Sequence, residues 1–312
     1  MGWPLRMFER NDVLFVTARC FQGRLLMRPS ARTNEVLGGV LARAARLTRV
    51  EIFAFVFASN HFHLLIRAPE ANLPQFMKYL RANVSKKVGW LVGWRGSFWE
   101  RRYSAEPVLD DPALIGRVRY LLAHGVKEGL VRTCREWPGL SSLSQMLGGP
   151  RRTFRWFNWT RRWRARRTEG NDRFHERWSE SETLELTPLP SCAARSEQAR
   201  RKLIVGAVAA INRQGAASFP HVLGRSRVLA QDPQHRPQQP ARRPRPWCHA
   251  TFRELRIEFI ERYRAFASLF LEASARWKRG DHDAPFPVTA VRPFLWPSRW
   301  LSDPQAAQLS YA

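Results

Sequence analysis

The sequence has no long hydrophobic run, and its few cysteines are scattered. The longest apolar stretch, 203–211, is well short of the roughly 20 residues that span a bilayer, so no membrane-spanning helix is expected. The N-terminus has no apolar segment of the roughly 7–15 residues found in secretory signal peptides. Cys20, Cys134, Cys192 and Cys248 lie far apart in the sequence, which favours unpaired thiols in a reducing cytoplasm over a disulfide framework or a zinc site.

Acidic residues are also scarce. The 312 residues include 26 Asp and Glu against 52 Lys and Arg, which gives a formal net charge of +26. A globular chain this basic usually meets a polyanion, either a nucleic acid or an anionic membrane surface. Only six of the basic residues are lysines, and an excess of arginine is also typical of GC-rich genomes. A hydrophobic content of 44% argues against a mostly disordered chain.

The first 147 residues alternate between patterns typical of strands and helices, and we interpret them as one domain. Apolar, β-branched runs predict strands at 12–20, 51–58, 61–67 and 98–109. Apolar residues at helical spacing predict helices at 33–49, 73–91 and 111–131. Thr33 is the expected N-cap of the first helix and Asp110 that of the last. The order β-α-β-β-α-β-α predicts an α+β, ferredoxin-like fold, in which helices cover one face of an antiparallel sheet.

Residues 148–312 differ in composition from the first 147 and are predicted to form a basic, mainly helical C-terminal extension. The segment 151–167 combines arginines with aromatic residues and contains no acid. Helices are expected at 198–212 and 251–278, the second of them amphipathic. The Pro-, Arg- and Gln-rich segment 231–246 is typical of an extended linker. The tail after residue 285 is expected to be irregular.

The motif Asn60-His61-Phe62-His63 is the clearest candidate for a functional site in the sequence. Because side chains alternate along a strand, His61 and His63 should share one face while Phe62 points to the other. Two imidazoles on one face supply half of a divalent-metal site. The alternative is a pair of surface histidines over a core phenylalanine.

A second group lies on the helix expected at 111–131. Tyr120, His124 and Lys127 are spaced to form a stripe along one helical face, opposite apolar residues that would pack on the sheet. A tyrosine oxygen can attack phosphorus when a metal ion withdraws charge from the phosphate. Tyrosines on helices are more often packing residues. Tyr103, beside Arg101 and Arg102, is the rival nucleophile.

The segments SNHFHLLI (59–66) and RYLLAHGVKEGLV (119–131) together resemble the HUH single-tyrosine transposases, and in particular the REP-associated tyrosine transposases with their IS200-like transposase domain. The family signature, close to Tyr-Ile-x-x-Asn-Pro-Val-Lys-x-Gly, falls on Tyr120, Val126, Lys127 and Gly129. Its Asn-Pro is replaced here by His124 and Gly125. FWERRY (98–103) also resembles the family, and the resemblance covers about residues 8–147.

The resemblance implies a metal-dependent transposase and endonuclease that cleaves and rejoins single-stranded DNA, at REP-like hairpins. Tyr120 would form a 5′-phosphotyrosine link, Lys127 would neutralise charge, and Mg²⁺ or Mn²⁺ would bind His61, His63 and His124. A homodimer is left open. Two alternatives remain: a catalytically inactive, domesticated protein that binds single-stranded nucleic acid, and a basic RNA-binding protein with structural histidines.

Basic and aromatic residues are the expected DNA contacts. Arginines can follow phosphates while tryptophans stack on bases or on arginine planes. The alternative for 151–167 is an ordinary basic helix whose aromatic side chains pack on the domain. The expected DNA-binding residues are Arg101, Arg102, Arg151, Arg152, Arg155, Trp156, Trp159, Arg161 and Arg162.

Overall fold

The computed structural model describes residues 5–165, 176–238, 246–288 and 290. Residues 8–259 form one compact unit, and residues 1–7 and 260–312 are grouped in another. The larger unit therefore includes the N-terminal domain expected at 1–147 from residue 8 onward, together with much of the extension. Among the described residues, no helix has the length and apolarity needed to span a membrane.

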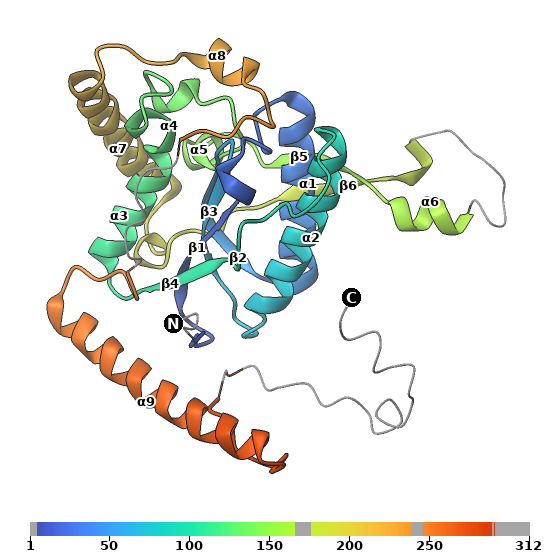
Figure 1. Cartoon of the computed structure of the whole chain (residues 1–312). Helices are drawn as coiled ribbons and strands as arrows, with labels where there is room; N and C mark the ends of the chain where they lie inside the picture. Colours follow the sequence, from blue (N-terminus) through green and yellow to red (C-terminus); the bar gives the residue numbers. More distant parts are fainter. Residues whose placement is uncertain (1–4, 166–175, 239–245, 289, 291–312) are drawn as a thin grey trace. The chain divides into compact units, whose positions relative to one another are not determined.

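A four-stranded antiparallel sheet forms the centre of the larger unit (Figure 1). Its spatial order is β2-β3-β1-β4, and α1 and α2 pack together on one face. The predicted ferredoxin-like order of elements is therefore confirmed. The elements of this core are β1 (Val13–Arg19), α1 (Ala31–Thr48), β2 (Glu51–Phe57), β3 (His61–Arg67), α2 (Leu73–Leu91) and β4 (Ser104–Val108).

Two predicted boundaries in this core are wrong. Ser30, not Thr33, caps α1, because the Ser30 hydroxyl accepts a hydrogen bond from the Thr33 backbone N–H at 3.0 Å. Thr33 lies inside the first turn and is buried. The strand expected at 98–109 is shorter, since only Ser104–Val108 pairs continuously with β1 and Trp99 forms an isolated bridge to Cys20.

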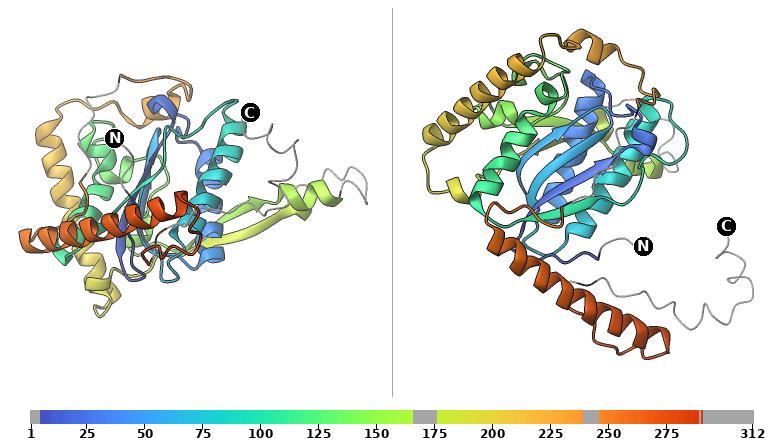
Figure 2. Two further views of the ribbon diagram at one scale, coloured as in Figure 1. Left: turned by 60° about the horizontal axis from the view of Figure 1, so that its bottom comes forward. Right: turned by 60° about the vertical axis from the view of Figure 1, so that its left-hand side comes forward.

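Helices that follow β4 cover the opposite face of the sheet (Figures 1 and 2). The apolar side of α3 packs there on side chains from β1, β2 and β3, as expected from its pattern. The helix predicted at 111–131 is interrupted at Ala123 and ends at Lys127. The helices of this part are α3 (Asp111–Leu122), α4 (His124–Lys127), α5 (Leu143–Met146) and α7 (Glu197–Ser218), the last of which includes the helix expected at 198–212.

The basic segment 151–167 does not form one basic helix over its described residues. β5 (Arg152–Phe157) pairs with β6 (Ser179–Leu184) in a hairpin, and α6 (Trp159–Ala165) follows β5. The hairpin packs against α1 and extends beyond the sheet (Figures 1 and 2). Phe154 lies directly over Gly38 of α1, where any side chain on the helix would overlap its ring. Arg166 and Arg167 fall outside the described residues.

The rest of the extension contains two more helices, α8 (Arg225–Ala230) and α9 (Arg253–Lys278). The second confirms the helix expected at 251–278. The first part of the expected linker, 231–238, contacts the core, where His235 accepts a hydrogen bond from the Leu25 backbone N–H. Residues 239–245 of that linker and most of the expected irregular tail lie outside the described residues. All four cysteines are unpaired, as predicted, and the structure also shows them to be buried.

Four short 3₁₀ turns complete the described secondary structure. They are η1 (Phe21–Gly23), η2 (Cys134–Glu136), η3 (Glu176–Trp178) and η4 (Pro190–Cys192).

Candidate active site

Strand β3 carries the two histidines of the HxH motif on one face. Phe62, between them, is fully buried in the core that α1 and α2 form on the other face. His61 is partly exposed, whereas His63 is buried. The two imidazole centroids are 4.8 Å apart, so the alternation expected from a strand produces the predicted pair.

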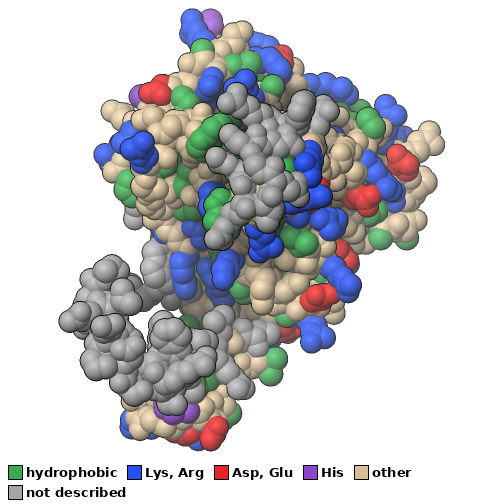
Figure 3. Space-filling model, turned by 90° about the vertical axis from the view of Figure 1, so that its right-hand side faces the viewer, with side chains coloured by type: hydrophobic (Ala, Val, Ile, Leu, Met, Phe, Trp, Pro, Cys, Tyr) green, Lys and Arg blue, Asp and Glu red, His purple; other side chains and the backbone are tan. Residues whose placement is uncertain are grey.

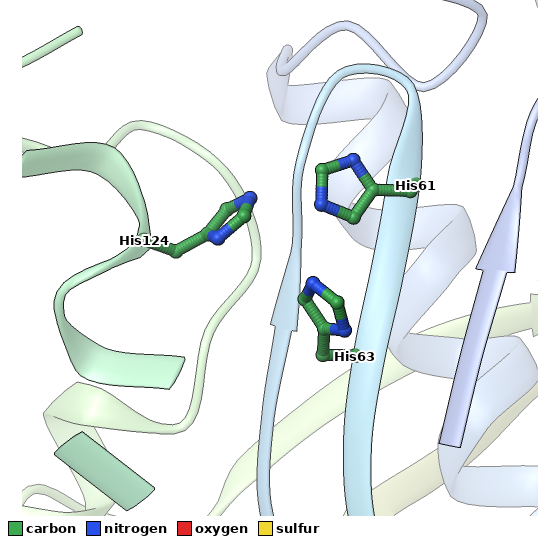
Figure 4. A group of neighbouring side chains, drawn as sticks. All are labelled: His61, His63 and His124. Atoms are coloured by element: carbon green, nitrogen blue, oxygen red, sulfur yellow. The ribbon is translucent and has the colours of Figure 1, made fainter. Parts of the chain in front are cut away.

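A third imidazole reaches this pair from α4. His124 is 2% exposed, and its ring centroid lies 4.7 Å from that of His61 and 5.3 Å from that of His63. One nitrogen from each of the three rings lies within 4.8 Å of the others (Figure 4). The next residue, Gly125, lies close to Trp137, where an added Cβ would come to 2.8 Å from the ring.

Burial keeps these imidazoles neutral. Loss of solvent lowers the pKa of both His61 and His63 well below the ordinary value of 6.5, and the neighbouring histidines lower it further. Burial, followed by the charge of Lys127, lowers the pKa of His124 to about 3. Neutral imidazole is the form that binds metal ions, so the cluster can act as a ligand set at neutral pH.

Two ring nitrogens of the cluster make no hydrogen bond to the described residues. His63 Nε2 and His124 Nδ1 are buried and have no hydrogen-bond partner within the part of the chain that the structure describes. Buried polar atoms are rarely left unpaired in native proteins. A divalent ion would satisfy such nitrogens, and the three-histidine group therefore fits a metal site.

Tyr120 lies on the last turn of α3, beside the histidines. Its half-buried ring is 5.3 Å from His63 and 6.1 Å from His124, measured between centroids. Two cations flank the ring: Lys127 Nζ at 3.9 Å and the guanidinium carbon of Arg117 at 5.1 Å from its centroid. The predicted group of Tyr120, His124 and Lys127 is therefore brought together, although a break separates α3 from α4.

Tyr103, the rival nucleophile considered from the sequence, and Tyr79 have different surroundings. Tyr103 is 7% exposed and belongs to the core on the α1 and α2 side of the sheet, away from the histidine face. Tyr79 of α2 packs against the same core and stacks on Trp156, with 6.2 Å between the ring centroids. Tyr120 is thus the tyrosine that contacts the histidine cluster in the described structure.

The expected DNA-binding residues of 151–162 are divided between two environments. Arg151, Arg155, Arg161 and Trp159 are exposed. Trp156 is only 7% exposed. Its ring packs between Arg43 and Lys87, with Lys87 Nζ 3.8 Å from the centroid, and its role in binding DNA stays a prediction.

The remaining expected DNA contacts are Arg152, Arg162, Arg101 and Arg102. Arg152 and Arg162 are partly exposed, and the Arg162 guanidinium lies over the Phe157 and Trp159 rings. Arg101 and Arg102 lie in the irregular segment between α2 and β4, where the Arg101 backbone oxygen accepts a hydrogen bond from Arg81. The role of all four in binding DNA stays a prediction. Figure 3 views the side of the molecule that carries α6 and shows many Lys and Arg side chains there.

Sequence reasoning did not identify Trp90 or Arg117. Trp90 is 72% exposed at the end of α2 and meets Trp159 at 6.1 Å. Its position beside Trp159 depends on how the β5–β6 hairpin packs, which no local pattern reveals. Arg117 lies about one turn before Tyr120, so helical spacing could have identified it as a neighbour.

Part of the chain matches a known protein family. Residues 27–121 match the family described as "Transposase IS200 like", a range that contains His61, His63 and Tyr120 and ends before His124. The match covers less than half of the chain, and it supports the family assignment inferred from the two motifs.

Two solved structures show similarity to parts of the chain. One is a REP-associated tyrosine transposase bound to a REP hairpin, with 18% identity, a TM-score of 0.42, and coverage of 47% of this chain and 86% of that one. The other is a candidate transposase from Deinococcus radiodurans R1, with 15% identity, a TM-score of 0.28, and coverage of 40% and 97%. No curated protein sequence matches the chain.

Proposed function

We propose that this protein cleaves and rejoins single-stranded DNA through a covalent link between Tyr120 and a 5′-phosphate. The contact between the half-buried Tyr120 ring and the three-histidine cluster carries the proposal. That contact joins a nucleophile of the right type to a candidate metal site, on a domain of the IS200-like transposase family.

His61, His63 and His124 would hold Mg²⁺ or Mn²⁺ through ring nitrogens. A bound divalent ion supplies Lewis-acid chemistry, polarising a non-bridging phosphate oxygen and orienting the phosphate. The histidines remain neutral because burial lowers their pKa values, so they present lone pairs and not positive charge to the ion.

The Tyr120 hydroxyl oxygen would attack the scissile phosphorus. One P–O bond forms to the tyrosine and the bond to the 3′ oxygen breaks; the phenol loses its proton and the departing 3′ oxygen gains one. Attack by a 3′-OH on the phosphotyrosine reverses the step and joins strands. The phosphodiester energy is retained in the covalent link, so the cycle needs no nucleotide cofactor.

Lys127 and Arg117 would place positive charge where the phosphate must approach. Lys127 Nζ is 3.0 Å from Glu128 and 3.9 Å from the Tyr120 ring centroid, which keeps the ammonium close to the nucleophile. Cations held in place before the reaction stabilise charge that develops in the transition state.

The part of the extension that contains β5 and α6 would hold DNA for the catalytic domain at 1–147. The surface that includes Trp90, Trp159, Arg155 and Arg161 joins exposed aromatic rings to arginines, the combination used to bind single strands. The Arg162 guanidinium lies over the Phe157 and Trp159 rings, so this surface also combines aromatic rings with a positive charge. We propose a hairpin-forming single strand as the partner.

A covalent-adduct assay tests the proposed reaction. Labelled hairpin DNA with single-stranded flanks is incubated with the full chain and Mn²⁺, and adducts that survive SDS are counted. The wild type and Tyr103→Phe should form the adduct, Tyr120→Phe should not, and EDTA or His61→Ala should abolish it.

Two results would reject parts of this function. Tight binding of DNA without any adduct in the wild type would favour the alternative of a catalytically inactive DNA-binding protein. An adduct that persists in EDTA and in His61→Ala would remove the metal role.

Binding of an oligonucleotide tests the proposed DNA surface separately. Trp159→Ala should weaken binding of a single strand by about 1–3 kcal/mol, because one stacking contact is lost. Trp247→Ala is the matched control, since Trp247 is 52% exposed and lies elsewhere in the sequence. Equal effects of the two substitutions would contradict a specific platform at Trp159.

A further inference from the structure

Asn60 precedes the first histidine of the HxH motif and contacts its ring directly. Asn60 Oδ1 lies 2.6 Å from His61 Nδ1, which is hydrogen-bonding distance. A neutral imidazole carries its proton on one of two nitrogens, and only the other nitrogen has a lone pair for a metal ion. The nature of the atom opposite Nδ1 therefore decides which His61 nitrogen can be a ligand.

The amide orientation of Asn60 is fixed by a second hydrogen bond. Its Nδ2 donates to the backbone oxygen of Gly23 at 3.1 Å. Turning the amide over would set Oδ1 against that carbonyl oxygen, two acceptors with no proton between them. Oδ1 therefore faces His61, and because it can only accept, His61 Nδ1 must carry the proton. The lone pair of His61 is left on Nε2.

Thr17 also contacts Nδ1 of a histidine, His63, but through a hydroxyl that can either donate or accept a hydrogen bond. The two residues are paired across β1 and β3, and Thr17 Oγ1 lies 2.7 Å from His63 Nδ1. A hydroxyl can accept from Nδ1–H by rotating its own proton away. His63 Nε2 is buried and lacks a hydrogen-bond partner among the described residues, which is consistent with a lone pair directed at a ligand.

We propose that Asn60 and Thr17 are positioning residues that hold His61 and His63 with the proton on Nδ1, so that both Nε2 atoms are presented with His124 to a metal ion. The proposal rests on the proposed metal role of this cluster. Partners behind metal-binding histidines commonly fix ring orientation and raise ligand basicity, and their loss typically lowers metal affinity about 10–100-fold. The hydrogen bond from Asn60 Nδ2 to the Gly23 backbone oxygen prevents the amide from turning over, so Asn60 presents an acceptor and not a donor to His61.

The protonated nitrogen can be observed without metal or DNA. Long-range ¹H–¹⁵N correlation spectra of the histidine-labelled full chain distinguish imidazoles protonated at Nδ1 from those protonated at Nε2. We expect His61 of the wild type to be protonated at Nδ1. In Asn60→Ala the acceptor is absent, and His61 should shift towards the Nε2-protonated form.

Binding of Mn²⁺, followed by the loss of its free-ion paramagnetic resonance signal, gives the second measurement. Asn60→Ala should weaken Mn²⁺ binding about 10–100-fold. Asn60→Asp keeps an acceptor for His61 but loses the donor to Gly23, so it should retain tight binding. Thr17→Ser keeps the hydroxyl and should bind as the wild type does, whereas Thr17→Val, of similar shape, should bind more weakly. Asn83→Ala is the control, because Asn83 donates to the Tyr79 backbone oxygen within α2.

The results separate this inference from the function on which it rests. If the wild type binds no Mn²⁺, the metal role itself fails. If the wild type binds Mn²⁺ but Asn60→Ala and Thr17→Val bind it equally well, the positioning role is overturned and the metal role stands. Weak binding by both Asn60→Ala and Asn60→Asp, with His61 still protonated at Nδ1, would also overturn it, because the bond to Gly23 would then be the important one.

Discussion

Lys127 Nζ lies 3.9 Å from the centroid of the Tyr120 ring, although α3 ends between the two residues. Ala123 makes this possible: its φ of −74° and ψ of −8° keep the chain close to helical geometry across the interruption. The ammonium is thereby held next to the proposed nucleophile, where an incoming phosphate would meet it.

Replacement of Lys127 by Met should slow formation of the covalent adduct. A hydrogen bond to a charged group is worth about 1.5–3 kcal/mol, which corresponds to a loss of roughly 10–150-fold in rate. Single-turnover kinetics with saturating DNA measure the effect on the chemical step alone. Arg119→Met is the matched control, because exposed Arg119 is adjacent in sequence to Tyr120 but is not among the cations over its ring. Similar rates for Lys127→Met and the wild type would contradict the assigned role.

The close approach of the β5–β6 hairpin to α1 depends on Gly38. A Cβ at this position would overlap the Phe154 ring, so Gly38→Ala should destabilise the fold by about 1–3 kcal/mol. Chemical denaturation measures the change. The double variant Gly38→Ala/Phe154→Ala should lose less free energy of unfolding than the sum of the losses in the two single variants, because the ring that causes the overlap is gone.

Gly206 supplies the matched control for Gly38. It also lies inside a helix, but an added Cβ would have open space around it. Gly206→Ala should therefore stabilise the protein by about 0.5–1 kcal/mol through helix propensity. Destabilisation by both substitutions to the same extent would show that Phe154 is not the cause.

Glu182 joins the hairpin to α1 and gives stability a pH dependence. Its buried carboxylate lies 2.6 Å from Arg43 and 2.9 Å from Arg46. Burial favours the neutral acid, but hydrogen bonds from Arg46 and Arg43 prevail and lower its pKa below the ordinary 4.5. The stabilising contribution is thus complete above that ordinary value and is lost as the pH falls through the lower, folded-state pKa.

Glu182→Gln should lower the free energy of unfolding by about 2 kcal/mol at pH 7. The difference from the wild type should shrink when the pH falls below 4.5, because protonation then removes the same charge from the wild type. Urea unfolding at pH 7 and at successively lower pH values measures the difference. A difference in the free energy of unfolding that stays constant with pH would mean that loss of the Glu182 charge is not the cause of the destabilisation.

Local patterns were sufficient for the half of the site that lies on β3. The alternation of His61, Phe62 and His63 is a property of any strand, so their faces could be predicted from sequence. The neighbourhood of Tyr120 and His124 was predictable from helical spacing. It holds despite the break at Ala123, because that residue keeps right-handed helical angles.

Other features depend on contacts that are distant in sequence. The β5 strand was missed because its arginines conceal an alternation in which Phe154 and Trp156 point inward. Its partner β6 is polar, and only its pairing with β5 and its ion pairs to α1 make it a strand. The hydrogen bonds of Asn60 to Gly23 and of Thr17 to His63 likewise exist only after the chain has folded.

His124 completes a candidate ligand set made of three imidazoles. In the described part of the chain, the group that could hold a metal ion contains no carboxylate. Imidazole nitrogen suits borderline transition-metal ions, whereas Mg²⁺ prefers oxygen ligands. We therefore expect the wild type to bind Mn²⁺ or Co²⁺ at least about tenfold more tightly than Mg²⁺, in line with the order of affinities for nitrogen sites.

His124→Asn tests this selectivity, because it exchanges a ring nitrogen for an amide oxygen at the same backbone position. The ratio of Mn²⁺ to Mg²⁺ affinity, measured by calorimetry on protein stripped of metal, should fall towards one as Mg²⁺ gains an oxygen ligand. His124→Ala should weaken the binding of both ions, since only His61 and His63 remain. If His124 were not a ligand, all three proteins would give the same ratio, and the burial of its Nδ1 without a hydrogen-bond partner among the described residues would need another cause.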